Sequence, residues 1–316
     1  GTHGSATLWF GEDEGFEYGT GFSIASYKNK LNWQARVNHS QPTWREDLFL
    51  VRTVGNETYD QVTKEPYDPV NNTISGNLDY YLSDKHSIGV SGRFSTRNSK
   101  RIATSRTAIS DASNTETLFS ENSFDRDRVN YNINPYYEYK TDTERLLLDF
   151  NYIDFTNDNT NTLYDVAGST IPFTDRRYIQ DGTYNIKTYR LDYSKEFTEN
   201  FKLSAGSRFA DVTTDNDLQS FIENNNNSFD KVINESSRFV IDETILAFYS
   251  KINANYGKWS FSGGLRYEDS NTEGLSIFME NNTTRREVQK RPIQKIFPMP
   301  SYILSNPPTH VQDRLP

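Results

Sequence analysis

Residues able to bind a transition metal are scattered along the chain. The sequence contains no cysteine and only four histidines. The histidines are His3, His39, His86 and His310. None of them has a partner at His-x-x-x-His spacing, which zinc sites on one helix face require. The sequence therefore predicts no metal site and no cofactor.

Two acidic clusters offer the oxygen ligands that Ca²⁺ prefers. One is Glu12-Asp13-Glu14, and the other combines Asp211, Asp215 and Asp217. Both lack the ligand spacing of an EF-hand loop. We expect solvated loops at these positions, with loop calcium as an open alternative.

Catalytic and nucleic-acid-binding signatures are absent from the sequence. It has no Gly-x-Ser-x-Gly elbow, no glycine-rich phosphate loop and no dinucleotide fingerprint. Its 43 acidic residues outnumber 34 basic ones, which gives a net charge of -9. Phosphate backbones are bound by lysine and arginine clusters. We expect a protein that is not an enzyme, with no nucleic acid as a partner.

Several charged and amide side chains occupy the hydrophilic alternate positions of segments with a period of two. They should therefore share one face. These candidate lumen-facing residues are Arg36, Arg93, Asn132, Arg208, Lys251, Arg266 and Glu268. In a barrel they would line the lumen. A merely solvated inner wall is the alternative.

The elements that carry these residues alternate with a period of two, which indicates strands. Within 245–268, apolar Leu246, Phe248 and Ile252 interleave with polar residues, and a reversal at Gly257 starts a second limb of the same kind. Leu31 to Asn38 shows the same alternation. Each limb thus has an apolar and a hydrophilic face.

Composition favours one large β architecture. The 316 residues include 20 Tyr, 20 Phe and 4 Trp, with a mean hydropathy of -0.80, which suits strands with one wet face. No run approaches the roughly 18 apolar residues of a spanning helix, so a membrane protein of this sequence would be a barrel.

Hairpins recur at a nearly constant spacing. Short turns centre near residues 29, 84, 142, 199 and 257. Between them we predict long polar loops over 40–70, 98–127, 156–181 and 211–237, the first with a small hairpin of its own. Short turns alternating with long loops are typical of outer-membrane barrels. Repeats also occur in propellers and solenoids, whose internal turn motifs are missing here.

Two local irregularities are expected in the strands. Pro135 lies on the apolar parity and removes a ladder donor, which predicts a bulge or other disturbance. Tyr184 and Ile186 lie on the opposite parity to Tyr189 and Leu191. Either a bulge intervenes or the former segment lies beyond the membrane.

Several motifs resemble one known family. Gly263-Gly264-Leu265-Arg266-Tyr267-Glu268, Asn77 to Leu82 followed by Lys85 to Ile88, Leu191-Asp192-Tyr193 with Ser204 to Ser207, and Ile296-Phe297-Pro298 are similar to segments of TonB-dependent outer-membrane receptors, in the Bacteroidetes-type outer membrane protein beta-barrel family. The resemblance covers about residues 4–304. It implies energy-coupled uptake through TonB.

Such receptors have about 22 strands around a plug, whereas this sequence accounts for about 11–12 strands and neither a plug nor a TonB-contacting segment. We therefore expect the N-terminal half of a barrel, over 4–304, with an irregular tail at 305–316. The fold class predicted is all-β, an antiparallel up-and-down meander of about 11–12 strands that is part of a transmembrane β-barrel. The chain starts at Gly1 without a leader, which favours a fragment.

The predicted function is that of a receptor fragment in the cell outer membrane, inactive alone, from a protein that imports a bulky ligand. Its expected partners are outer-membrane lipid, a plug domain, the TonB complex and an unidentified ligand. One alternative is a passive channel or a structural or adhesive barrel. The other is a soluble β-domain that binds glycans.

Overall fold

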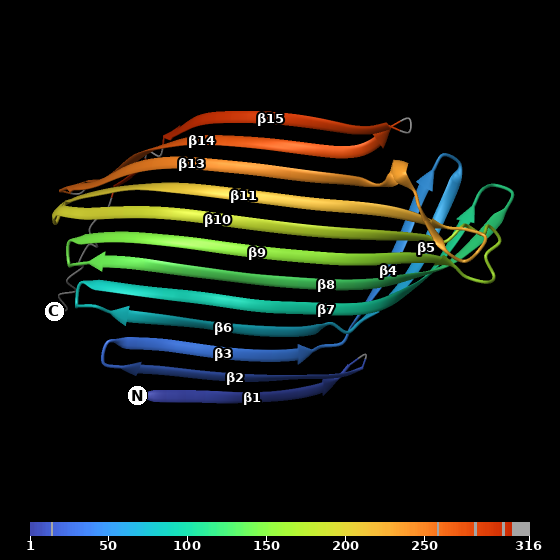
Figure 1. Ribbon diagram of the computed structural model, residues 1–316, viewed down its shortest axis with the longest axis horizontal. Coiled ribbons are helices and arrows are strands. Elements are labelled where there is room, and N and C mark those ends of the chain that lie inside the picture. The colour runs from blue at the N-terminus through green and yellow to red at the C-terminus, as the bar shows by residue number, and fades with distance from the viewer. Residues whose placement is uncertain (14, 258, 281–282, 299–300, 305–316) are drawn as a thin grey trace, which may run out of the picture.

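The computed structural model describes residues 1–13, 15–257, 259–280, 283–298 and 301–304. It is an antiparallel sheet whose strands lie side by side in one layer (Figure 1). Within the described residues, twelve strands form the continuous path β1-β2-β3-β6-β7-β8-β9-β10-β11-β13-β14-β15. The predicted fold class, an all-β up-and-down meander, is confirmed.

The first strands are shorter than those that follow. They are β1 (Thr2–Glu12), β2 (Phe16–Lys28), β3 (Leu31–Gln41), β4 (Trp44–Val54), β5 (Glu57–Tyr67) and β6 (Val70–Tyr81). The long central strands are β7 (His86–Ser110), β8 (Thr115–Lys140), β9 (Glu144–Asp165), β10 (Arg176–Thr198) and β11 (Phe201–Glu223). The remaining elements are β12 (Phe229–Lys231), the 3₁₀ turn η1 (Ile233–Glu235), β13 (Ser237–Tyr256), β14 (Trp259–Glu280), β15 (Thr283–Pro298) and β16 (Ser301–Leu304).

The five predicted short turns are confirmed, and they lie together at one end of the sheet, on the left in Figure 1. Two of them use left-handed backbone: Asn29 has φ 56° and Gly257 has φ 59°. Asparagine and glycine adopt this region most readily. In these two hairpins the turn residue therefore helps to fix where the chain reverses.

At the opposite end, three of the four predicted loops are wrong in extent. Segments 98–127, 156–181 and 211–237 are largely strand, because β7 to β11 continue well past the region of apolar alternation. The fourth prediction, for 40–70, holds better. There β4 and β5 form the expected small hairpin, and residues 58–64 of β5 pair with 104–110 of β7.

The sheet has no apolar core in its described part. Its buried hydrophobic side chains are Ala103, Ala210 and Ala247, whereas large apolar side chains such as Leu265 and Phe248 are 60% and 49% exposed. A folded sheet that leaves so much apolar surface uncovered needs a nonpolar environment on that side.

Pro135 disturbs pairing without shifting register. Ile133 pairs with Tyr152 and Tyr136 with Asp149, while the two positions between make no bridge to β9. Proline cannot donate to the carbonyl of Phe150, and the side-chain amide of Asn134 donates to it instead, at 2.8 Å. The expected irregularity is thus an interruption of the ladder in which a side-chain amide replaces the missing backbone donor, and not a bulge.

No bulge causes the aromatic side chains to change from one face at Tyr184 to the other face at Tyr189. β10 pairs with β9 and β11 without a break from Arg176 to Lys195. Tyr184 packs on Phe155, with ring centroids 5.6 Å apart, on the face opposite to Tyr189. This leaves the second interpretation, that the aromatic pair lies beyond the membrane-facing band.

No helix in the described ranges is long and apolar enough to cross a membrane. The sheet ends at two edges, and in the described residues no bridge joins β1 to β15. The predicted tail at 305–316 lies outside the described residues.

Candidate functional site

The register separates the side chains into two faces of opposite character. Residues directly opposite on neighbouring strands point to the same side of a sheet. One such row is Val37, Ile74, Phe94 and Tyr131, and the adjacent row is Arg36, Ser75, Arg93 and Asn132. We call the side of the first row the apolar face and the side of the second the polar face.

The apolar face has the dimensions of a membrane-facing band. On β10, Tyr189, Leu191 and Tyr193 occupy it between Lys187 and Lys195. Both lysines lie near carboxylates: Lys187 is 3.5 Å from Asp211, and Lys195 is 3.8 Å from Glu144. A tilted strand needs roughly nine residues to cross the hydrocarbon, so each charged pair marks a border of the band.

An apolar hollow of about 480 Å³ lies at the centre of the structure, mostly on this band. Phe150, Tyr189, Phe209 and Phe248 line it on the apolar face around the small Ser207. Its size and lining suit an acyl chain or another apolar group.

All seven candidate residues lie on the polar face, but the structure brings only three of them together. Arg36, Arg93 and Asn132 line one hollow of about 350 Å³ with Gln34 and Asn77 among its walls. The other four are spread over β11, β13 and β14. Of these, Arg266 and Glu268 form an ion pair at 2.9 Å.

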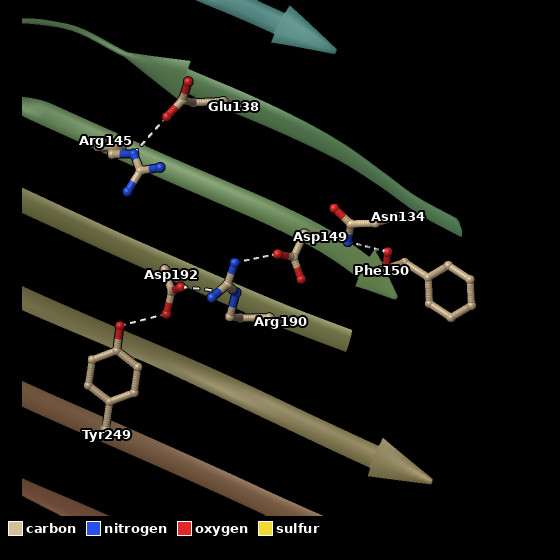
Figure 2. A network of polar contacts seen from close by, with 8 residues as sticks. All are labelled: Asn134, Glu138, Arg145, Asp149, Phe150, Arg190, Asp192 and Tyr249. Atoms are coloured by element: carbon tan, nitrogen blue, oxygen red, sulfur yellow. Dashed lines mark hydrogen bonds and ion pairs between the residues drawn. The ribbon is translucent and has the colours of Figure 1, made fainter. Parts of the chain in front are cut away.

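Arg208 borders a second polar hollow, of about 270 Å³, beside an ion network (Figure 2). In that network Arg190 pairs with Asp149 and with Asp192, the latter at 3.4 Å from Nε to Oδ2. The Tyr249 hydroxyl donates to Asp192 at 2.6 Å. The charges of this part of the face are therefore largely compensated within the protein.

Two identical three-strand rows hold the polar face together. In one, Asp79, Gly89 and Tyr136 lie opposite one another, and Tyr136 donates to Asp79 at 2.8 Å. In the other row, Asp192, Gly206 and Tyr249 repeat the arrangement. Each tyrosine ring lies over the glycine, where a Cβ would collide with it.

Sequence reasoning did not predict these Asp-Gly-Tyr rows. A signal for them exists, because Leu-Asp-Tyr occurs at both 78–80 and 191–193, each time followed by a short turn and a glycine. The aspartate is the polar member of an otherwise apolar motif. Its partner tyrosine comes from a strand two positions away in the sheet, which no local pattern reveals.

A second missed feature is rich in arginine. Arg97 and Arg101 on β7, with Arg126 and Arg128 on β8, lie on the polar face. Arg101 and Arg126 fall within the segment predicted as loop, and Arg97 and Arg128 border it. Arg101 pairs with Glu65. The guanidiniums of Arg97 and Arg101 also lie over the Tyr67 ring, 5.3 and 5.2 Å from its centroid. Burial, followed by the charges of Arg128 and Arg101, lowers the pKa of Arg126.

In the second of the two acidic clusters, Asp211, Asp215 and Asp217 all have partners in the protein, and Asp211 lies 3.5 Å from Lys187. Asp215 forms an ion pair with Arg238, which lowers the pKa of Asp215 mainly through their hydrogen bond. Asp217 accepts a hydrogen bond from Gln219 at 2.9 Å. Glu14 lies outside the described residues. Over the described ranges, no group of three or more histidine, cysteine or acidic side chains is arranged to hold a metal ion.

Fold and faces together define an outer-membrane type of β-sheet protein, with an apolar face for lipid and a polar face for water. The family model described as the outer membrane protein beta-barrel family matches residues 137–309, more than half of the chain. The chain belongs to this family. It is accordingly a protein of the cell outer membrane. No curated protein matches the sequence.

Solved structures similar to the chain include proteins of different activities. The outer membrane protease OmpT from Escherichia coli is 11% identical, with a TM-score of 0.28, over 92% of this chain and 99% of that one. The Ralstonia pickettii toluene transporter TbuX is 13% identical, with a TM-score of 0.32, over 93% and 86%. The ferric yersiniabactin uptake receptor FyuA from Yersinia pestis is 7% identical, with a TM-score of 0.33, over 92% and 61%.

Proposed function

We propose that the chain is part of a TonB-dependent receptor that takes up a bulky ligand across the outer membrane, and that it is inactive alone. The observation that carries this proposal is the polar face, a wall of hollows backed by a lipid-facing band. The motifs at 77–88, 191–207 and 263–268, which resemble those of such receptors, support it. Energy coupling rests on that resemblance.

The open sheet also supports a larger assembly. β1 pairs only with β2 and β15 only with β14 among the described residues. Hydrocarbon does not tolerate unpaired strand edges. We infer that further strands close the barrel, and that a plug domain and the TonB complex act with it. Outer-membrane lipid would cover the apolar face.

The role proposed is not catalytic. In the central network, Arg190 is ion-paired with Asp149 and Asp192, and Tyr249 also donates to Asp192. Such a compensated set positions strands and has no activated nucleophile. Peptide hydrolysis by the purified protein that disappears in the Asp149→Asn and Asp192→Asn variants would contradict this part of the proposal.

Two measurements test the proposal as a whole. The purified chain in planar bilayers should give no steady channel current. Cells producing an intact receptor that contains this segment should accumulate its ligand only with functional TonB and a proton-motive force. A steady conductance from the chain, or uptake that persists without TonB, would favour a passive channel instead.

A further inference from the structure

The arginine-rich part of the polar face has an uncompensated charge. Arg97 lies directly opposite Arg128, and Arg93 lies on the same face of β7, four residues before Arg97. In the described residues none of these three arginines forms an ion pair with a carboxylate. Like charges directly opposite on neighbouring strands are unfavourable. Within the described residues, no ion pair of these three arginines offsets this repulsion.

Neutral partners hold two of these guanidiniums in place. Arg97 Nε donates to the Tyr67 hydroxyl at 3.0 Å, and Arg128 Nε donates to Asn157 Oδ1 at 2.9 Å. The Arg97 guanidinium is also 5.6 Å from the Trp44 ring centroid. Bonds at Nε and stacking on aromatic rings orient the planar fork without neutralising it.

The three arginines converge on a hollow of about 370 Å³ between β6, β7, β8 and β9. Its other walls are Asn71, Thr73, Asn130 and Phe155 with two further hydroxyl side chains, and no carboxylate lines it. Arg93 also borders the neighbouring hollow that contains Arg36. The two hollows therefore meet at Arg93, and both are lined by arginine on a chain whose overall charge is negative.

We propose that Arg93, Arg97 and Arg128 bind carboxylate or phosphate groups of an anionic ligand. Arginine forks match both groups bidentately, and the Phe155 ring offers an apolar surface to the ligand body. This inference rests on the proposed uptake function, because it names the chemical class of the cargo. A lipid headgroup is the less favoured occupant, since the site lies on the face opposite to the lipid band.

Calorimetric titration of the 316-residue chain in detergent at low salt tests the proposal, with citrate as the probe. Citrate should bind, and its neutral trimethyl ester should not. The variant Arg97→Gln/Arg128→Gln should weaken citrate binding by at least about tenfold, a loss of about 1.4 kcal/mol. The charge-preserving Arg97→Lys/Arg128→Lys variant should bind with intermediate affinity and keep the salt dependence.

Arg238→Gln is the matched control, because Arg238 already pairs with Asp215 and lies on the other face; its citrate affinity should not change. Thermal unfolding checks that the variants fold, and citrate should raise the midpoint of the wild type but not of the double glutamine variant. Equal binding of citrate by the wild type and that variant, or equal binding of the ester, would overturn the proposal.

The two proposals can fail separately. Citrate binding is measured without TonB or energy, so it can hold even if uptake is passive. Conversely, TonB-dependent uptake with no citrate binding at these arginines would refute the proposed anionic site and leave the proposed receptor function standing. If anionic lipid vesicles bind through these arginines and citrate does not, the arginines would be assigned to a lipid headgroup, and the proposal would be contradicted.

Discussion

At the scale of single residues, Gly89 and Gly206 each leave room for a tyrosine ring that crosses their strand. A Cβ on Gly206 would lie 2.7 Å from the carbonyl oxygen of Leu191 and would meet the Tyr249 ring. The backbone oxygen cannot move away without disturbing the pairing of β10 and β11. The glycine is thus needed for the tyrosine to cross one strand and reach Asp192.

Gly206→Ala should therefore lower the free energy of unfolding by about 1–3 kcal/mol, the usual cost of overpacking. Thermal unfolding in detergent, followed by the heat-dependent gel shift, would measure it. Gly263→Ala is the control, because nothing lies within 4 Å of a Cβ built there, and it should be neutral or slightly stabilising. Equal effects of the two substitutions would refute the role of Gly206.

Asn134 and Pro135 form a compensating pair of residues. Asn134→Ala removes the donor to the Phe150 carbonyl and should cost about 1 kcal/mol of unfolding free energy. In Asn134→Ala/Pro135→Ala the new backbone N–H can donate instead, so most of that loss should be recovered.

A double-mutant cycle of denaturant unfolding checks this coupling, which should exceed about 0.5 kcal/mol. Asn132→Ala serves as the control, since its side chain bonds to Asn151 at 3.5 Å and does not involve Pro135. Additive effects of Asn134→Ala and Pro135→Ala would show that the amide does not replace the missing donor.

At the scale of elements, the extended ends of four strands place aspartates in one row. Asp127, Asp158, Asp181 and Asp217 lie directly opposite one another on β8, β9, β10 and β11. Burial, then the charges of Asp158 and Asp217, raises the pKa of Asp181 above its ordinary value of 3.8. The row is thus a repulsive feature beyond the membrane-facing band.

Asp181→Asn should stabilise the protein at pH 7 by about 0.5 kcal/mol, a cross-strand like-charge term reduced by solvent screening. Because the pKa is raised in the folded state, the wild-type penalty exists above that pKa and fades as the pH falls through it. Unfolding midpoints of both proteins between pH 7 and pH 4 should converge at the acidic end. A difference in unfolding midpoint that does not change with pH would contradict the proposed repulsion within the aspartate row. So would the same pH-dependent difference for Asp142→Asn, which lies in an exposed turn.

The elements also show what the sequence could predict. Where one face meets lipid, alternation such as Leu246, Phe248 and Ile252 locates strands, faces and turns, and these predictions are confirmed. Beyond the band both faces are wet, so β7 and β8 continue through Asn98 to Asp127 without alternation and were predicted as loop. Arg101 and Arg126 lie in this segment, and Arg97 and Arg128 border it, so the alternation does not single them out. Arg36, Arg93 and Asn132 lie within the alternating region, so their common face can be predicted from the sequence.

At the scale of the whole molecule, the separation of faces replaces a hydrophobic core. Twelve strands in one layer bury little apolar area against one another, so stability depends on what covers each face. The family membership places lipid on one side. Within the membrane-facing band, odd-numbered and even-numbered positions of a strand should then meet different surroundings, lipid on one face and water on the other.

The absence of cysteine from the sequence makes this expectation directly measurable, because each introduced thiol is the only one. Leu191→Cys and Leu246→Cys lie on the apolar face, and Ser194→Cys and Ser204→Cys, directly opposite one another, lie on the polar face. In outer membranes from cells producing the protein, fluorophores at 191 and 246 should be quenched by spin-labelled acyl chains. The thiols at 194 and 204 should react with a charged, water-soluble reagent, because polar-face positions line an aqueous lumen. The reverse pattern would mean that the polar face meets lipid and the apolar face meets water. Equal reactivity at all four positions would mean that the sheet does not span the bilayer.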